Sequence, residues 1–175
     1  TKNGLPAMKL VNPITPYINI VASSLTTEIA SVFIVFSANN NAQDSVFFQL
    51  LDDSSNYFTI GLGALDASAA YSSRFISNST ALIGSGGVLN DTNLKLISSL
   101  TNLTTITTML NNINPTTTTQ SRSNTGGNAI NLGARAGSGF GADIHFSELF
   151  IYESNQSTDL AAIQSNIISN NSIVL

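Results

Sequence analysis

The sequence predicts an all-β sandwich of two antiparallel sheets with one short C-terminal helix. Many short runs rich in β-branched and aromatic residues are separated by clusters of Gly, Asn, Asp and Ser, as strands are by turns. One segment near the C-terminus shows apolar residues at helical spacing. No Pro- or Gly-rich linker divides the 175 residues, so we expect a single domain over residues 1–175.

Three strands are predicted in the first third of the chain, after a lead-in strand or arm at residues 1–12. The run at residues 29–36 is almost continuously apolar, which indicates a strand covered on both faces. In the last of the three, Phe58, Ile60 and Leu62 share one face. The strands span residues 29–36, 45–51 and 57–62.

Further strands are predicted in the rest of the chain. The polar run at residues 111–119 has β propensity but no apolar face, which indicates a loop or an exposed edge. In the last strand the apolar phase changes near Ser147. Either its second half is apolar on both faces, or a bulge at Ser147–Glu148 shifts the phase. These strands span residues 71–76, 94–97, 103–110, 129–135 and 142–152.

A helix is predicted over residues 157–170. Its apolar residues recur at the spacing of one helical face. Ser157-Thr-Asp159 supplies an N-cap and an acid in the first turn, and Asn170-Asn171 is a suitable end. A single amphipathic helix in a β chain is most simply a cover over one sheet.

Charge is scarce in this chain, and that excludes several functions. Lys and Arg total 6 and Asp and Glu total 10, while charged residues make up 9% of the chain, against about 25% in a typical domain. Asn, Ser and Thr supply 63 residues instead. With a net charge of -4, nucleic acid is not an expected partner. The absence of cysteine excludes disulfides and thiolate metal sites, and the short apolar runs predict no membrane insertion.

The stretch from Asn131 to Ile173 carries a family resemblance. It contains Asn131-Leu-Gly-Ala-Arg135, Gly137-Ser-Gly-Phe-Gly-Ala-Asp-Ile144, Phe146-Ser-Glu-Leu-Phe-Ile-Tyr152 and then the helix. This pattern resembles the end of a laminin-G-like domain of the concanavalin A-like lectin/glucanase superfamily, of the kind found in bacteriophage structural proteins. Asn171-Ser172 departs from the family's usual Tyr-Gly. The resemblance implies a jelly roll with loops at one rim that can bind sugars.

Glycoside hydrolysis is the enzymatic activity that the resemblance suggests. It needs two carboxylates about 5–9.5 Å apart, and none of the three Glu residues lies in the Glu-x-Asp-x-x-Glu pattern of laminarinase-like members. Asp143 and Glu148 come nearest, but an odd separation places them on opposite faces of a regular strand. We therefore predict no enzymatic activity and no catalytic residue. Glu148 is expected to bind backbone or Arg135, and His145 to be a partly exposed strand residue.

Candidate ligand-binding residues lie near predicted turns and on polar strand phases. Aromatic rings stack on sugar faces, while amides and guanidinium groups bind sugar hydroxyls. The candidates are Tyr57, Tyr71, Arg74 and Asn56.

Calcium is the one cofactor that the sequence suggests. Laminin-G-like domains often hold Ca²⁺ at a rim, and Asp52 and Asp53 with Asn56 form an oxygen-rich turn. The alternative is that these acids bond their own backbone, as turn residues commonly do.

The combined features favour display or binding over catalysis. The leading hypothesis is a non-enzymatic lectin-like module on a virion surface, as a head-fibre, decoration or tail-adhesin domain that binds glycans. The first alternative is a purely structural virion or lattice protein that contacts other structural proteins. The second is a secreted bacterial cell-surface carbohydrate-binding module. Each places the protein outside the cell, and a homo-oligomer is compatible with all three.

Overall fold

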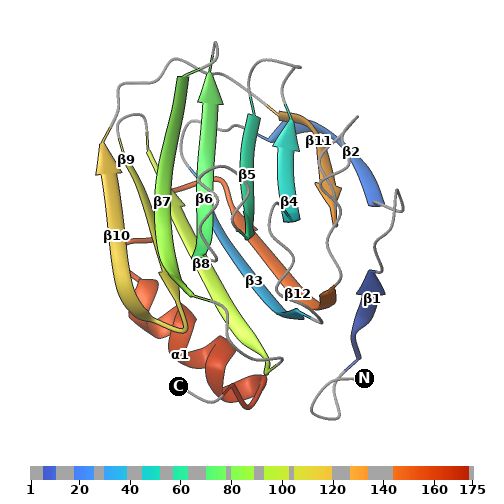
Figure 1. Ribbon diagram of the computed structural model, residues 1–175, viewed down its shortest axis with the longest axis vertical. Helices are drawn as coiled ribbons and strands as arrows, with labels where there is room; N and C mark the ends of the chain where they lie inside the picture. Colours follow the sequence, from blue (N-terminus) through green and yellow to red (C-terminus); the bar gives the residue numbers. More distant parts are fainter. Residues whose placement is uncertain are drawn as a thin grey trace.

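Two six-stranded antiparallel sheets face each other, and helix α1, Leu160–Asn170, lies outside one of them (Figure 1). The computed structural model describes residues 6–10, 18–25, 30–38, 45–51, 57–62, 70–77, 80–88, 93–102, 105–119, 127–133 and 144–173. Sheet 1 has the order β1-β12-β3-β8-β9-β10, with bounds Met8–Leu10, Ile144–Tyr152, Ala30–Ala38, Lys95–Thr101, Thr105–Leu110 and Ile113–Thr119. Sheet 2 has the order β2-β11-β4-β5-β6-β7, with bounds Ile18–Leu25, Gly127–Leu132, Ser45–Leu51, Tyr57–Leu62, Ala70–Ser77 and Thr80–Val88.

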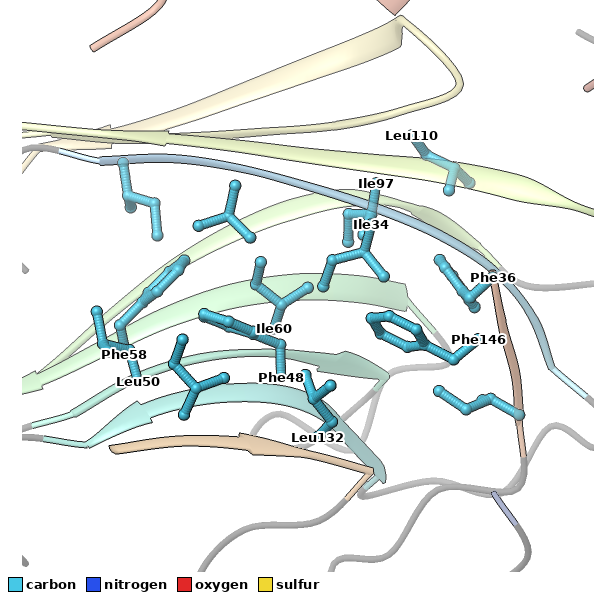
Figure 2. Close-up of a cluster of buried hydrophobic side chains, with 14 residues drawn as sticks. Ile34, Phe36, Phe48, Leu50, Phe58, Ile60, Ile97, Leu110, Leu132 and Phe146 are labelled. Atoms are coloured by element: carbon cyan, nitrogen blue, oxygen red, sulfur yellow. The ribbon is translucent and has the colours of Figure 1, made fainter. Parts of the chain in front are cut away.

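The main core fills the space between the sheets (Figure 2). Alternate residues of the strands point into it because side chains in a strand alternate between faces. Large aromatic members are fully buried, among them Phe36 and Phe48. At one side the edge strands β7 and β10 of the two sheets lie against each other (Figure 1). The predicted fold class is therefore confirmed.

Strand β3 is covered on both faces, as its continuous apolar run predicts. Val32, Ile34 and Phe36 belong to the main core between the sheets. Phe33 and Val35 belong to a second core under helix α1, together with the residues Leu94, Leu96, Ile167 and Ile173. The helix therefore covers the outer face of sheet 1, which confirms the predicted cover.

Strand β12 contains the predicted bulge. Its pairing with β3 shifts between Phe146 and Glu148, so Ser147 is the extra residue. Before the shift Phe146 faces the main core, and after it Leu149 packs against that same core. Phe150 now packs against the core under the helix. The second half of β12 is thus apolar on both faces, and both of the interpretations left open by the sequence are correct.

Residues 111–119 form a turn and an edge strand, so the exposed-edge interpretation is confirmed and the loop interpretation is wrong. Asn111 and Asn112 have φ of 48° and 63°, the two positive values that a type I′ hairpin turn requires. Asn tolerates this conformation because its short polar side chain bonds locally. Asn111 also accepts a 2.8 Å hydrogen bond from the Leu96 N–H through its Oδ1. Strand β10 then ends the sheet, with an exposed Pro115 that suits an edge.

Helix α1 begins at Leu160, three residues later than predicted. The preceding segment forms turns instead, in which Ser157 N–H donates to Asn155 Oδ1 at 2.9 Å and Asp159 N–H donates to Gln156 O at 3.1 Å. Asp159 occupies the N-cap position without a side-chain cap bond, and the first turn holds no acid. The expected first-turn acid was therefore wrong, because the helix begins at Leu160 and Asp159 stands one position before its first turn.

The helix ends in a Schellman motif, with Ser172 in the left-handed position that glycine usually takes. Ser172 has φ of 51°. Its N–H donates to Ser169 O at 3.3 Å, and Ile173 N–H donates to Ile168 O at 3.1 Å. Ile168 and Ile173 also meet in the core under the helix. The departure from the family's Tyr-Gly therefore leaves the backbone motif intact and places a Cβ where it is unfavourable.

Replacing Ser172 with glycine is expected to raise the free energy of unfolding by about 0.5–1 kcal/mol, because glycine adopts this conformation without strain. Urea unfolding followed by circular dichroism measures the change. Ser169→Gly, at an exposed position inside the helix, is the matched control and should lower stability by about 0.5 kcal/mol. An unchanged or lowered midpoint for Ser172→Gly would contradict the assigned strain.

Candidate functional site

A row of polar side chains crosses the outer face of sheet 2. Asn131, Gln49 and Thr59 are directly paired neighbours on β11, β4 and β5. The residues on either side of each of them point into the main core, so these three point away from it. Asn131 Nδ2 donates to Gln49 Oε1 at 2.9 Å. We call Asn131, Gln49 and Thr59 the polar row.

The polar row is buried, with exposures of 0% for Asn131, 1% for Gln49 and 4% for Thr59. Buried amides are costly unless they are hydrogen-bonded, and the Asn131–Gln49 bond supplies partners across two strands. A one-residue slip of either strand would turn these amides into the main core. The row therefore fixes the register of the strands beside it. The sequence analysis did not predict the polar row. The local pattern that indicates it is a single amide residue flanked by apolar residues within a strand.

Two of the predicted ligand residues are placed next to this row. Arg74 on β6 is paired with Thr59, and Tyr57 precedes Thr59 by two positions on β5. Tyr71 is paired with Leu62 at the opposite end of the β5–β6 hairpin, and Leu62 lies five residues from Tyr57 along β5. At a rise of about 3.4 Å per residue this is about 17 Å. The structure therefore brings the backbones of Tyr57 and Arg74 together and separates Tyr71 from them.

The predicted calcium ligands lie outside the described residues. This applies to Asp52 and Asp53, and also to Asn56, the fourth predicted ligand-binding residue. Among the described residues, no group of three or more His, Cys, Asp or Glu side chains could hold a metal ion. Calcium binding thus stays a prediction.

Glu148 and His145 lie on β12, on either side of the bulge. Glu148 Oε2 accepts a 2.9 Å hydrogen bond from Asn171 Nδ2, at the end of helix α1. The expected structural role holds, but this partner is an amide side chain, and Arg135 lies outside the described residues. His145 is half-buried and is paired with Ser37 and with Lys9, which matches the expected strand position.

Comparison with known proteins identifies the fold. No protein-family model matches the sequence, and neither does any curated protein. Solved structures do match: a SAP-like pentraxin from Limulus polyphemus has a TM-score of 0.63 at 12% identity, covering 87% of this chain and 76% of the pentraxin. The galectin LEC-6 from Caenorhabditis elegans has a TM-score of 0.51 at 14% identity, covering 82% of this chain and 95% of the galectin. The fold is a concanavalin A-like jelly roll.

Another similar jelly roll is domain 4 of AbnA, an extracellular GH43 arabinanase of Geobacillus stearothermophilus, solved in complex with arabinotriose. It has a TM-score of 0.62 at 14% identity, and the match covers 82% of this chain and 68% of that domain. In the described part of this jelly roll, no helix has both the length and the apolar character needed to cross a membrane.

Proposed function

We propose that this jelly roll is a non-enzymatic, lectin-like module that binds glycans. The observation that carries the proposal is the match to AbnA domain 4, a jelly roll of similar architecture that was solved with arabinotriose. A galectin shares the architecture as well. The backbone positions of Tyr57 and Arg74 support it, because they lie on neighbouring strands of sheet 2, two positions apart in register, and a ring and a guanidinium group together can bind a sugar face and its hydroxyls.

The setting that we propose is an extracellular surface, with a virion as the leading case. It is supported by a chain poor in charge and rich in amides and hydroxyls, whose interactions would change little with salt. Glycan binding on such a particle would make the domain an adhesin or a decoration. A catalytic role is not part of the proposal, because Glu148, the acid nearest to the hydrolase pattern, is bonded to Asn171.

A glycan array followed by titration calorimetry tests this function. We expect the wild type to bind a neutral oligosaccharide, and Tyr57→Ala and Arg74→Ala to weaken that binding about ten-fold or more. Tyr57→Phe keeps the ring and should bind within about two-fold of wild type. Lys9→Ala is the matched control for Arg74→Ala, because it removes an exposed cation from the other sheet.

Absence of binding to every glycan on the array would contradict the proposal. If the intact particle still required the domain for assembly, the purely structural alternative would replace it. Binding that is insensitive to both Tyr57→Ala and Arg74→Ala would keep the function and remove these residues from the site.

A further inference from the structure

A groove with a volume of about 320 Å³ lies between strand β12 and helix α1, on the outer face of sheet 1. Two half-buried aromatic residues of β12, Phe150 and Tyr152, form one side of it. Four helix residues form the other side, and none of the lining residues is charged. These helix residues are Ala162, Ile163, Asn166 and Ile167.

The aromatic side of the groove is held in place by the core beneath it. Tyr152 makes an edge-to-face contact with Phe33, with ring centroids 5.9 Å apart and planes at 87°. Phe33 is fully buried in the core under the helix. The groove is therefore preformed, which lowers the ordering cost of binding.

The groove also carries a polar group of the kind that binds hydroxyls. Asn166 is exposed, and its Oδ1 accepts a 3.0 Å hydrogen bond from Asn170 Nδ2, which leaves the Asn166 NH₂ group to donate to a ligand. Glu148 and Asn171, bonded to each other at 2.9 Å, are not among the lining residues, and the Asn171 side chain is buried. The polar contact that the groove offers is therefore the Asn166 amide.

We infer that this groove binds one neutral sugar residue, whose apolar face lies against Phe150 and Tyr152 and whose hydroxyls bond the Asn166 amide. Aromatic side chains together with a few placed polar groups are the usual lining of such sites, and the volume is at the small end of ligand pockets. A charged ligand would find no countercharge among the lining residues. An apolar peptide side chain would leave the Asn166 amide unused.

This inference rests on the proposed function and adds a second contact region to it. The groove lies on the outer face of sheet 1, whereas Tyr57 and Arg74 belong to strands of sheet 2. One domain would then touch a polysaccharide at two places, and simultaneous contact would raise its avidity beyond that of either region.

The test is an NMR titration of the folded protein with arabinotriose, lactose and cellobiose. In the wild type we expect the Asn166 side-chain amide resonances to shift with added sugar. Ala162→Trp, which fills the groove from an exposed helix position, and Asn166→Ala should each weaken the groove's affinity about ten-fold or more. Ala161→Trp, at an exposed neighbouring position outside the lining, is the matched control and should bind within about two-fold of wild type.

The outcomes separate the two proposals. Sugar binding that leaves Asn166 unshifted and Ala162→Trp unaffected overturns the groove while the lectin function stands. A wild type that binds neither these sugars nor any glycan on the array overturns both. Self-association that Ala162→Trp abolishes, without sugar-dependent shifts at Asn166, also overturns the groove site and assigns it to a second copy of the chain.

Discussion

Phe33→Ala is expected to lower the free energy of unfolding by about 3–5 kcal/mol, the usual cost of removing a buried phenylalanine ring. Phe33 is 0% exposed and packs in the core under helix α1, where it contacts the Tyr152 ring. The cavity left behind would lie between β3 and the helix, two rigid elements that cannot close it by side-chain motion alone. Urea unfolding followed by circular dichroism measures the loss as a lower midpoint with an unchanged slope.

The control for this prediction is Phe33→Leu, which keeps most of the volume and should cost less than about 1.5 kcal/mol. A loss below about 1 kcal/mol for Phe33→Ala would show that the ring does not fill the space assigned to it. A fall in the slope together with the midpoint would instead indicate that the helix separates from the sheet before the rest unfolds.

The second large effect is expected at the polar row. Asn131→Leu should lower the free energy of unfolding by about 1–3 kcal/mol, because it removes the side-chain bond that Gln49 Oε1 accepts in a buried position. Replacing both partners, as Asn131→Leu with Gln49→Met, should recover part of this loss, since no amide of the pair then stays buried. Chemical unfolding of the two single variants and the double variant completes a double-mutant cycle.

Asn166→Leu is the matched control for Asn131→Leu, because it makes the same exchange at an exposed helix position and should change stability by less than about 0.5 kcal/mol. Additive losses in the double variant would contradict the assigned coupling between Asn131 and Gln49. A double variant less stable than either single variant would do so as well.

The sequence could predict the elements whose apolar pattern has one interpretation. Strand β3 has a continuous apolar run, as a strand that packs in both cores needs. Strands β4 and β5 have the predicted bounds. The bulge in β12 was readable because an apolar phase that changes within a strand needs an extra residue. Fold class and these strands therefore follow from local pattern.

Other features depend on partners that are remote in the chain. Strand β7 was not predicted, because its TALIGSGGV segment contains three glycines and little alternation. The threonines of β10 form a strand because β9 lies beside them to pair with. The pairing of Asn131 with Gln49, 82 residues apart, leaves no local mark beyond an amide in an apolar run. These features require knowledge of which strands become neighbours.

The bulge at Ser147 also makes that position the one that β12 can lose. With Ser147 as the extra residue, Phe146 and Leu149 face the core between the sheets, and Phe150 faces the core under the helix. Loss of Ser147 would leave a regularly alternating strand in which these residues keep their faces and Glu148 stays on the side of Asn171. Loss of a residue after the bulge would instead turn either Glu148 or the apolar residues beyond it to the opposite face. Related chains should therefore tolerate a one-residue deletion at this position better than at its neighbours in β12.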